Sequence, residues 1–359
     1  LYPLARSMNR KLEFYVGPTN SGKTYNAMKK LKEANSGLYL APLRLLALEG
    51  YEDLKESKIE ASLITGEEQQ LSEDAAHICS TIEMLDFDLE VDVAVIDEVQ
   101  MLEDNDRGWA WVNAIIGVPA KKVIMTGSVN ALEAVKRIVQ YLDEELEVVR
   151  HKRKNPLLVL QKWTPLEKLE NGTALIAFSR AEVLKLKQKL QKKYSVSVIY
   201  GNLSPEVRRD EARRFRDGQS QILIATDAIS MGLNLPIKTI LFTTDTKFDG
   251  ISKRKISVNE IVQIAGRAGR YGLFEAGYLG ATRRDVLEYI KEEFEAPIKT
   301  IKPPFKVKIN NSQLENLSMH LKTKSLGKVL NFFALNMKFA GPFEAANLSS
   351  MLEASRIVE

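Results

Sequence analysis

The stretch EFYVGPTNSGKTYNAM, Glu13 to Met28, decides the fold of the N-terminal part of the chain. A short aromatic and β-branched run meets a glycine turn, and the turn leads into a helix-forming segment. The spacing of Gly17 and Gly22-Lys23-Thr24 fits a P-loop, whose glycines allow main-chain N–H groups to face phosphate oxygens. Lys23 adds positive charge, and the Thr24 hydroxyl can ligate Mg²⁺. The stretch therefore predicts a nucleoside triphosphate site between a strand and a helix.

The composition is that of a globular protein with room for at least two hydrophobic cores. The 359 residues are 45% hydrophobic and 27% charged, with one cysteine, Cys79, and a net charge of +4. A single cysteine excludes an internal disulfide framework, and the histidines show no metal-ligand spacing. No apolar run has membrane-spanning length, so we expect no membrane partner. The mildly basic charge permits a polyanionic partner without identifying one.

Apolar strand-like segments alternate with amphipathic or turn-rich stretches up to about residue 150, and the alternation restarts after the charged stretch RHKRKNP. Such alternation predicts parallel sheets covered by helices. Past KPPF, Lys302 to Phe305, amphipathic helical segments replace the strands. The predicted fold class is α/β: two tandem parallel-sheet domains, residues 1–152 and 153–296, followed by a small all-helical segment, residues 297–359.

An acidic pair follows one of the predicted strands, because VAVIDEVQ contains Asp97 and Glu98 directly after an apolar run. In open parallel sheets, ligands bind at the carboxyl ends of the strands. One carboxylate can hold Mg²⁺ there while the other polarises a water molecule. Thr126 and Ser128, in IMTGS, stand at another strand end and give a weaker signal of the same kind.

The second domain contains QIAGRAGR, in which Arg267 and Arg270 are three residues apart. This spacing predicts two guanidinium groups on one helical face, suited to stabilise the triphosphate held by the neighbouring domain. A surface helix with ion pairs is the alternative. If the first interpretation holds, hydrolysis opens and closes a cleft between two domains, as in a motor.

In this order, the motifs resemble those of the DExH-box helicases of superfamily two, and within them the Suv-three-like RNA helicases. The resemblance covers nearly the whole chain and rests on GPTNSGKT, APLRLLALEGYEDL, TGEE, STIEM, DEVQ, RGWAW, ALIAFSR, VIYGNLSP, ATDAISMGLNLP and QIAGRAGR. It implies that both domains are RecA-like, with ATP or other nucleoside triphosphates and Mg²⁺ as cofactors. It also implies an ATP-dependent RNA helicase that translocates three-prime to five-prime and unwinds duplexes in RNA turnover.

The resemblance further implies roles for individual residues. Catalysis would involve Lys23, Asp97, Glu98, Gln263, Arg267 and Arg270, and the metal would be held by Thr24 and Asp97. Nucleotide binding would involve Gly17, Pro18, Thr19, Asn20, Ser21, Gly22, Lys23, Thr24, Asp227 and Gly232. The nucleic-acid track would run over Pro42, Arg44, Thr65, Gly66, Thr81, Ser179, Arg180, Gly201 and Thr226. These small polar and main-chain contacts suit binding that ignores base sequence.

The expected partners are single-stranded RNA and RNA duplexes with an overhang; DNA and an exoribonuclease partner stay open. The alternatives are a helicase for DNA or hybrid duplexes and an ATP-gated clamp or scaffold that does not unwind. The hydroxyl-rich TGS, Thr126 to Ser128, departs from eukaryotic members, so we favour a bacterial cytoplasmic protein over one of the mitochondrial matrix. Finally, the DG turn in TTDTKFDGISKRKIS, Thr243 to Ser257, predicts a hairpin. The resemblance implies that this hairpin separates strands during unwinding, and an exposed connecting loop is the alternative.

Overall fold

In a computed structural model, the chain forms two compact units. Unit 1 comprises Leu1–Val16, Lys23–Arg150 and Thr300–Glu359, and unit 2 comprises Gly17–Gly22 and His151–Lys299. The predicted boundaries at residues 152 and 296 stay predictions. Within the part of the chain that the structure describes, no helix is both long enough and apolar enough to cross a bilayer. The described residues are 2–201, 203–230, 234–336 and 339–358.

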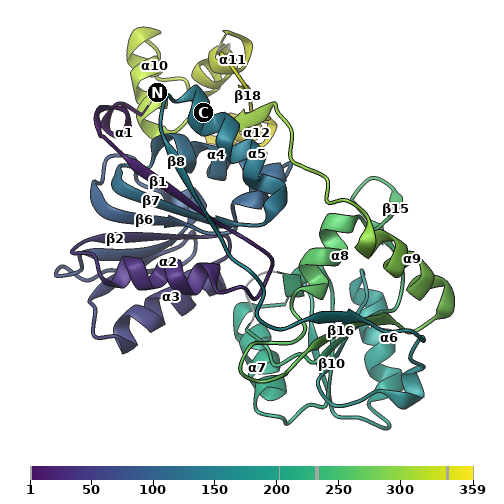
Figure 1. Cartoon of the computed structure of the whole chain (residues 1–359). Helices are drawn as coiled ribbons and strands as arrows, with labels where there is room; N and C mark the ends of the chain where they lie inside the picture. The colour runs from purple at the N-terminus through teal and green to yellow at the C-terminus, as the bar shows by residue number, and fades with distance from the viewer. Residues whose placement is uncertain (1, 202, 231–233, 337–338, 359) are drawn as a thin grey trace. The chain divides into compact units, whose positions relative to one another are not determined.

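The sheet of unit 1 has the strand order β4-β3-β5-β2-β6-β7-β1-β8 (Figure 1). Neighbouring strands are parallel, except that β4 pairs antiparallel with β3. Most of these strands are short and rich in apolar residues, as expected for a sheet buried on both faces, whereas the edge strand β4 consists of two exposed glutamines. The bounds are β1 Lys11–Val16, β2 Gly37–Ala41, β3 Ala61–Ile64, β4 Gln69–Gln70, β5 His77–Thr81, β6 Val91–Ile96, β7 Ala120–Gly127 and β8 Leu146–Arg150.

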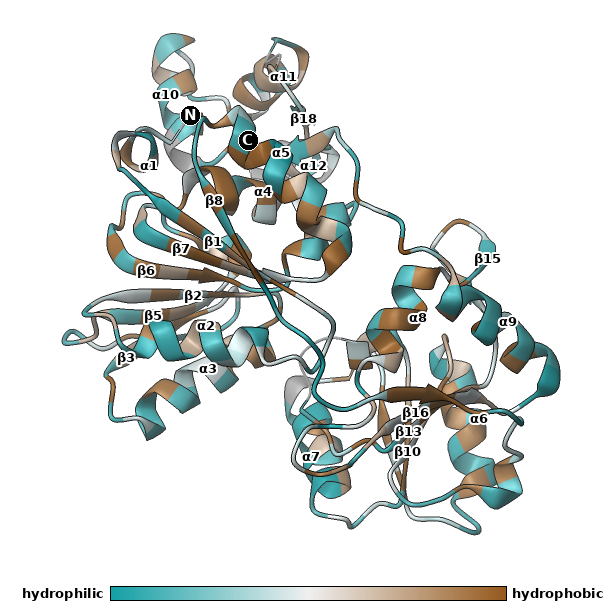
Figure 2. Ribbon diagram, viewed as in Figure 1, coloured by the Kyte–Doolittle hydropathy of each residue, from teal (hydrophilic) through white to brown (hydrophobic). Residues whose placement is uncertain are grey.

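Helices cover both faces of this sheet. The helices α2 (Lys23–Lys32) and α3 (Arg44–Glu56) enclose one core, in which Leu31 and Leu54 are fully buried. The helices α4 (Gly108–Gly117) and α5 (Leu132–Tyr141) enclose the other core, together with the short α1 (Pro3–Ser7). Figure 2 shows hydrophobic residues along the strands and in α4, and hydrophilic residues on the outer side of α2. Short 3-10 helices follow several strands: η1 Ile82–Met84, η2 Val99–Glu103 and η3 Val129–Ala131.

The C-terminal segment from Thr300 packs onto unit 1, where Phe305 and Val307 enter the core beside α4. It is mostly helical, as predicted, but it also contains the short parallel strands β17 and β18, so the expectation of an all-helical segment is wrong in this detail. Three-residue strands that are separated in the chain by two helices leave no periodic pattern in the sequence. The bounds are β17 Phe305–Val307, α10 Asn311–His320, α11 Leu326–Asn336, β18 Phe343–Ala345 and α12 Ser349–Val358.

The sheet of unit 2 is parallel, with the strand order β11-β12-β10-β13-β16-β9. Its core includes Val183 and Leu190 of α6, which packs on one face. The strands are β9 Leu157–Val159, β10 Thr173–Ile176, β11 Val196–Ile199, β12 Ile222–Ala225, β13 Thr239–Phe242 and β16 Gly277–Ala281. The helices are η4 Leu166–Lys168, α6 Arg180–Leu190, α7 Pro205–Arg216, η5 Asp227–Ser230, α8 Val258–Ala265 and α9 Arg284–Glu295. Two parallel-sheet domains of RecA-like type confirm the predicted fold class.

The predicted hairpin between β13 and α8 is confirmed. Strand β14 (Thr246–Phe248) pairs antiparallel with β15 (Lys253–Lys255), in the register Thr246↔Lys255, Lys247↔Arg254 and Phe248↔Lys253. The Asp249 carboxylate accepts from the main-chain N–H groups of Ile251 at 2.9 Å and Ser252 at 2.8 Å. Gly250 has φ 99°, a conformation that favours glycine. Aspartate and glycine therefore form the turn, as the DG pair predicts.

Candidate nucleotide and nucleic-acid sites

Candidate nucleotide residues follow three neighbouring strands of unit 1, β6, β7 and β1, and of these residues Gly17–Gly22 are assigned to unit 2. The P-loop follows β1, the acidic pair follows β6, and Thr126 to Ser128 stand at the end of β7. In the loop, Asn20 has φ 60° and Gly22 has φ 81°, so the chain turns through left-handed conformations before α2 begins at Lys23. Carboxyl ends of adjacent parallel strands meet at one edge of a sheet, which is where such sheets bind ligands.

Three hydroxyl groups hold the buried carboxylate of Asp97, which is 2% exposed. Thr24 Oγ1 donates to Oδ1 at 2.9 Å, Thr126 Oγ1 donates to the same oxygen, and Tyr39 OH donates to Oδ2 at 2.9 Å. Burial raises the pKa of Asp97, and the neighbouring Glu98 raises it further, whereas the three hydroxyl donors act in the opposite direction. The Tyr39 contact was not predicted, although a tyrosine in a buried apolar strand needs a polar partner for its hydroxyl.

The residues present fit a Mg²⁺ ion. This ion prefers oxygen ligands and is commonly held by one or two protein groups together with water and substrate phosphates. Thr24 and Asp97 supply a hydroxyl and a carboxylate whose oxygens are 2.9 Å apart. Thr24 is the last residue of the P-loop that would bind the phosphates. The assignment of Thr24 and Asp97 as metal ligands stays a prediction.

Gln100, the last residue of DEVQ, connects two parts of the site. Its Nε2 donates to the carboxylate of Glu98, and its Oε1 accepts from the main-chain N–H of Ser128 at 3.1 Å. Glu98 has φ 55°, and its own N–H donates to Asp97 Oδ1 at 3.1 Å and to Thr126 Oγ1 at 3.2 Å. The side chain and the main chain of Glu98 are therefore both anchored to the end of β7. The sequence signal for Gln100 was present in the motif, but no role was assigned to it.

The RGWAW stretch contacts the main chain of the acidic pair. The Trp111 indole Nε1 donates to the main-chain carbonyl oxygen of Asp97 at 2.8 Å, from a fully buried position in α4. Arg107 donates from Nε to Glu83 Oε1 at 2.7 Å and from Nη2 to the Pro42 carbonyl at 2.7 Å. The RGWAW stretch therefore has a structural role, because its contacts hold the chain after β6 and the chain after β2 in place.

In unit 2 the two arginines do not share a helical face, so this part of the prediction is wrong. Helix α8 ends at Ala265, and Gly269, at φ 71°, continues the turn that contains Arg267. A Cβ at Gly269 would lie 2.3 Å from the main-chain nitrogen of Gly277, so only glycine fits. Arg267 donates from Nε to the Ser230 carbonyl at 2.9 Å, which brings the turn against η5.

The other candidate nucleotide residues of unit 2 lie around α8 and η5. Gln263 is half-buried in α8. Asp227 opens η5 directly after β12, and its Oδ2 accepts from Lys247 Nζ at 2.6 Å. Arg270 donates to the Asn234 carbonyl at 3.5 Å. Gly232 lies outside the described residues. The roles predicted for these residues stay predictions.

The candidate track residues of unit 1 follow the adjacent strands β3, β5 and β2, which form the other half of the same sheet edge. Thr65 is buried, and its hydroxyl donates to the Glu68 carbonyl at 3.0 Å, which shapes the TGEE turn. Arg44 is paired with both acids of that turn: Nη1 contacts Glu67, and Nη2 contacts Glu68 at 3.0 Å. Pro42 follows β2, Gly66 follows β3, and Thr81 ends β5.

The candidate track residues of unit 2 also follow three adjacent strands, β10, β12 and β11. Ser179 is the N-cap of α6 and accepts from the N–H of Glu182 at 3.2 Å, and the Arg180 guanidinium lies 5.7 Å from the centroid of the Tyr200 ring. Thr226 follows β12, where its Oγ1 accepts from the N–H of Ala228 at 3.3 Å. Gly201 follows β11, and a Cβ there would meet open space. In both units, the candidate track residues thus follow three adjacent strands in one half of the sheet.

Two parallel-sheet domains, with a P-loop after β1 and an acidic pair after β6 in the first sheet, are of the RecA-like type. A family model described as the DEXQ-box helicase domain of Suv3 matches residues 1–151, and a helicase conserved C-terminal domain matches residues 155–272. The chain belongs to the Suv3-like helicases of superfamily two, as predicted.

Individual relatives agree with the family models. The chain is 41% identical over 310 residues to the ATP-dependent RNA helicase SUV3, mitochondrial, of Candida albicans, covering 84% of this chain and 43% of that protein. It is 36% identical to DExH16, mitochondrial, an ATP-dependent RNA helicase of Arabidopsis thaliana, covering 100% and 64%. The chain therefore spans about half the length of such relatives. A solved structure of S. cerevisiae Dbp5 bound to RNA and ADP BeF3 shares the fold, with a TM-score of 0.60 at 17% identity, covering 81% of this chain and 85% of that chain.

The preference for a bacterial cytoplasmic protein is wrong. Relatives from Candida albicans, Saccharomyces cerevisiae, Arabidopsis thaliana, Caenorhabditis elegans and Gallus gallus are all named mitochondrial. The preference rested on the hydroxyl-rich TGS at Thr126 to Ser128. In the structure, these residues contact Asp97 and Gln100, so they report on the chemistry at a strand end and carry no information about a compartment.

Proposed function

We propose that this protein is an ATP-dependent RNA helicase that couples nucleic-acid-stimulated NTP hydrolysis to three-prime to five-prime translocation and duplex unwinding in RNA turnover. The observation that carries the proposal is the strand order of unit 1. Residues suited to a triphosphate follow β6, β7 and β1, and residues suited to a nucleic-acid backbone follow β3, β5 and β2. In the proposal, one edge of the sheet therefore binds both the triphosphate and the nucleic acid. A structural change where the triphosphate binds can then move the residues that contact the nucleic acid.

The proposed chemistry uses groups that this chain holds in position. Main-chain N–H groups of the P-loop and the Lys23 ammonium bind the phosphates, while Thr24 and Asp97 bind Mg²⁺. When bound, Mg²⁺ neutralises charge on the phosphate oxygens. Glu98 orients the attacking water, and the amide of Gln100 fixes the orientation of Glu98. In the proposal, the phosphate-side groups contributed by unit 2 are Asp227, Gly232, Gln263, Arg267 and Arg270.

The proposed substrate is single-stranded RNA or an RNA duplex with an overhang. Hydroxyls, main-chain groups and two arginines line the strand ends of both units, and such groups contact a backbone without reading bases. They also discriminate weakly against DNA unless the 2′-OH is contacted. The names of the relatives support a mitochondrial location, and an exoribonuclease partner is a proposal that rests on the family alone.

Strand displacement tests the proposal directly. Matched RNA, DNA and hybrid duplexes, each with a three-prime or a five-prime overhang, are incubated with the protein, ATP and Mg²⁺. We expect ATP-dependent displacement of RNA duplexes that carry a three-prime overhang. In parallel, Glu98→Gln should retain nucleotide binding but lose hydrolysis by several orders of magnitude. RNA-stimulated hydrolysis without displacement of any duplex would indicate a clamp, and would contradict the helicase proposal.

A further inference from the structure

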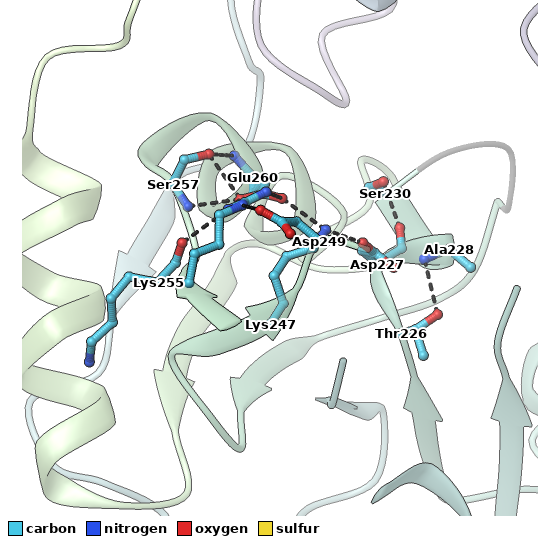
Figure 3. Close-up of polar contacts among 10 residues, drawn as sticks. Thr226, Asp227, Ala228, Ser230, Lys247, Asp249, Lys255, Ser257 and Glu260 are labelled. Carbon is cyan, nitrogen blue, oxygen red and sulfur yellow. Dashed lines mark hydrogen bonds and ion pairs between the residues drawn. The ribbon is translucent and has the colours of Figure 1, made fainter. Parts of the chain in front are cut away.

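A network of ionic contacts connects the hairpin, Thr246–Lys255, with η5 and with α8 (Figure 3). Two of its members, Lys247 and Arg254, lie directly opposite each other in the hairpin register, so their side chains emerge on the same face. Phe248 and Lys253 form the next pair and emerge on the other face. The hairpin therefore has one face directed at the rest of unit 2 and one face directed away from the network.

Glu260, in the first turn of α8, is the meeting point of these contacts. Arg254 donates to both carboxylate oxygens, at 2.8 and 2.9 Å, and Lys247 Nζ donates to Oε1 at 2.9 Å. Ser257, the N-cap of α8, donates to Oε2 through its main-chain N–H at 2.8 Å. Burial opposes the negative charge of Glu260, yet the donors from Arg254, Ser257 and Lys247 lower its pKa to about 2. Glu260 is therefore a fixed anion near neutral pH.

Lys247 carries the connection onward to η5. Its Nζ lies 2.6 Å from Asp227 Oδ2 and 2.9 Å from Glu260 Oε1, so one ammonium group bridges two carboxylates on two different elements. The Lys247 side chain is 16% exposed, compared with 55% for Lys255 on the opposite face. A partly buried ion pair contributes little net stability on average, because desolvation offsets the attraction. The bridge therefore fits a positioning role better than a purely stabilising one.

The two bridged elements carry groups of the proposed nucleotide site. Asp227 opens η5, and the carbonyl of Ser230 in the same element accepts from Arg267. Glu260 belongs to α8, which contains Gln263 one turn later and leads into the turn with Arg267. A movement of the hairpin that shifts Lys247 must move η5 or α8 with it, or break one of its two ion pairs.

We propose that Lys247 is a positioning residue that couples the hairpin to NTP hydrolysis, by holding Asp227 and Glu260 in register. The inference rests on the proposed function, since it gives this bridge a part in RNA-stimulated hydrolysis. When a nucleic-acid strand contacts the hairpin, its displacement reaches α8 through Lys247 and Arg254, and it reaches η5 through the Lys247 ammonium group. Hydrolysis then responds to the state of the hairpin, and the hairpin is part of the coupling between the NTP and the nucleic acid.

The test compares Lys247→Met with Lys247→Arg in steady-state hydrolysis, with and without single-stranded RNA. Lys247→Met should lower the RNA-stimulated kcat by roughly tenfold, with the KM for ATP and the RNA affinity changed by less than about threefold. Lys247→Arg keeps the charge and should restore most of the rate. The matched control is Lys189→Met, which removes a lysine and an exposed ion pair with Glu167 from the same unit.

A double-mutant cycle separates coupling from simple loss of structure. If the bridge acts as a unit, Glu260→Gln combined with Lys247→Met should cost no more than the larger single effect. Thermal unfolding of each variant reports on the fold. Wild-type stimulation in Lys247→Met, or a lost rate that Lys247→Arg does not restore, would overturn the inference. If the wild-type protein itself shows no RNA-stimulated hydrolysis, the result contradicts the proposed function. If the wild-type protein is stimulated by RNA and only the Lys247 variants depart from expectation, the result contradicts the inference about Lys247 alone.

Discussion

The hydroxyl of Tyr39 donates a 2.9 Å hydrogen bond to Oδ2 of Asp97, within the core beneath the proposed metal site. Tyr39 is 2% exposed, and burial together with Asp97 raises its pKa well above the usual value, so it stays a donor. Groups that orient a metal ligand typically change metal affinity by 10- to 100-fold when removed. Tyr39→Phe should therefore raise the Mg²⁺ concentration for half-maximal hydrolysis by roughly tenfold.

The matched control for this prediction is Tyr51→Phe, which removes a hydroxyl from another buried tyrosine in the same core. The Tyr51 hydroxyl accepts a hydrogen bond from Lys55 Nζ at 3.3 Å. Both variants keep the ring, and each should lose about 1 kcal/mol of stability. An unchanged Mg²⁺ requirement in Tyr39→Phe would remove Tyr39 from the site.

The strand ends could be predicted from the sequence because each buried strand is a short apolar run followed by small polar residues. Tyr39 and Lys247 could not be, since their contacts depend on strand order and on a hairpin register that local patterns do not encode. The predicted helical face for Arg267 and Arg270 fails for a physical reason. Glycines close to the end of a helix allow the chain to turn away from the helix axis. Residues three apart beyond that point then no longer lie on one helical face.

The pairing of Arg44 with Glu67 and Glu68 predicts competition between these acids and RNA phosphates. Glu67→Gln with Glu68→Gln should free the guanidinium and tighten single-stranded RNA binding by roughly two- to fivefold at low salt, a gain that screening should reduce at high salt. Fluorescence anisotropy with a labelled oligonucleotide measures this. The control, Glu73→Gln with Asp74→Asn, makes the same change of charge at exposed positions nearby. If both double variants gain equally, Arg44 has no special contact with RNA.

The arginines of QIAGRAGR give a sharper expectation. An arginine that stabilises the transition state contributes on the order of a thousandfold in rate. Arg267→Ala or Arg270→Ala should abolish RNA-stimulated hydrolysis and leave single-strand binding nearly intact. Arg267→Lys keeps the charge but cannot reproduce the planar fork, and we expect it to recover only part of the rate. A variant that loses RNA affinity and keeps its hydrolysis would assign that arginine to the nucleic-acid track.

Nucleotide selectivity should be loose. The proposed contacts involve phosphates and Mg²⁺, which all nucleoside triphosphates share. GTP, CTP and UTP should support turnover within roughly tenfold of ATP, or about 1.4 kcal/mol of discrimination. The values of kcat/KM for the four nucleotides measure this. A preference for ATP far beyond tenfold would reveal a base-reading contact.

The tip of the hairpin is the candidate for separating strands. Phe248 is 63% exposed and Ile251 is 93% exposed, so two apolar side chains are available there to stack on or wedge between bases. Removing the whole hairpin cannot test this, because Lys247 and Arg254 would be lost with it and hydrolysis would change as well.

Phe248→Ala with Ile251→Ser leaves both ionic residues in place. We expect this variant to lose strand displacement and to keep RNA-stimulated hydrolysis within about twofold, whereas Lys247→Met should lower the RNA-stimulated rate by roughly tenfold. Leu184→Ala, a partly exposed leucine of α6, serves as the control. Full displacement by the tip variant would make the tip an exposed turn and move the strand-separating role to another part of the protein.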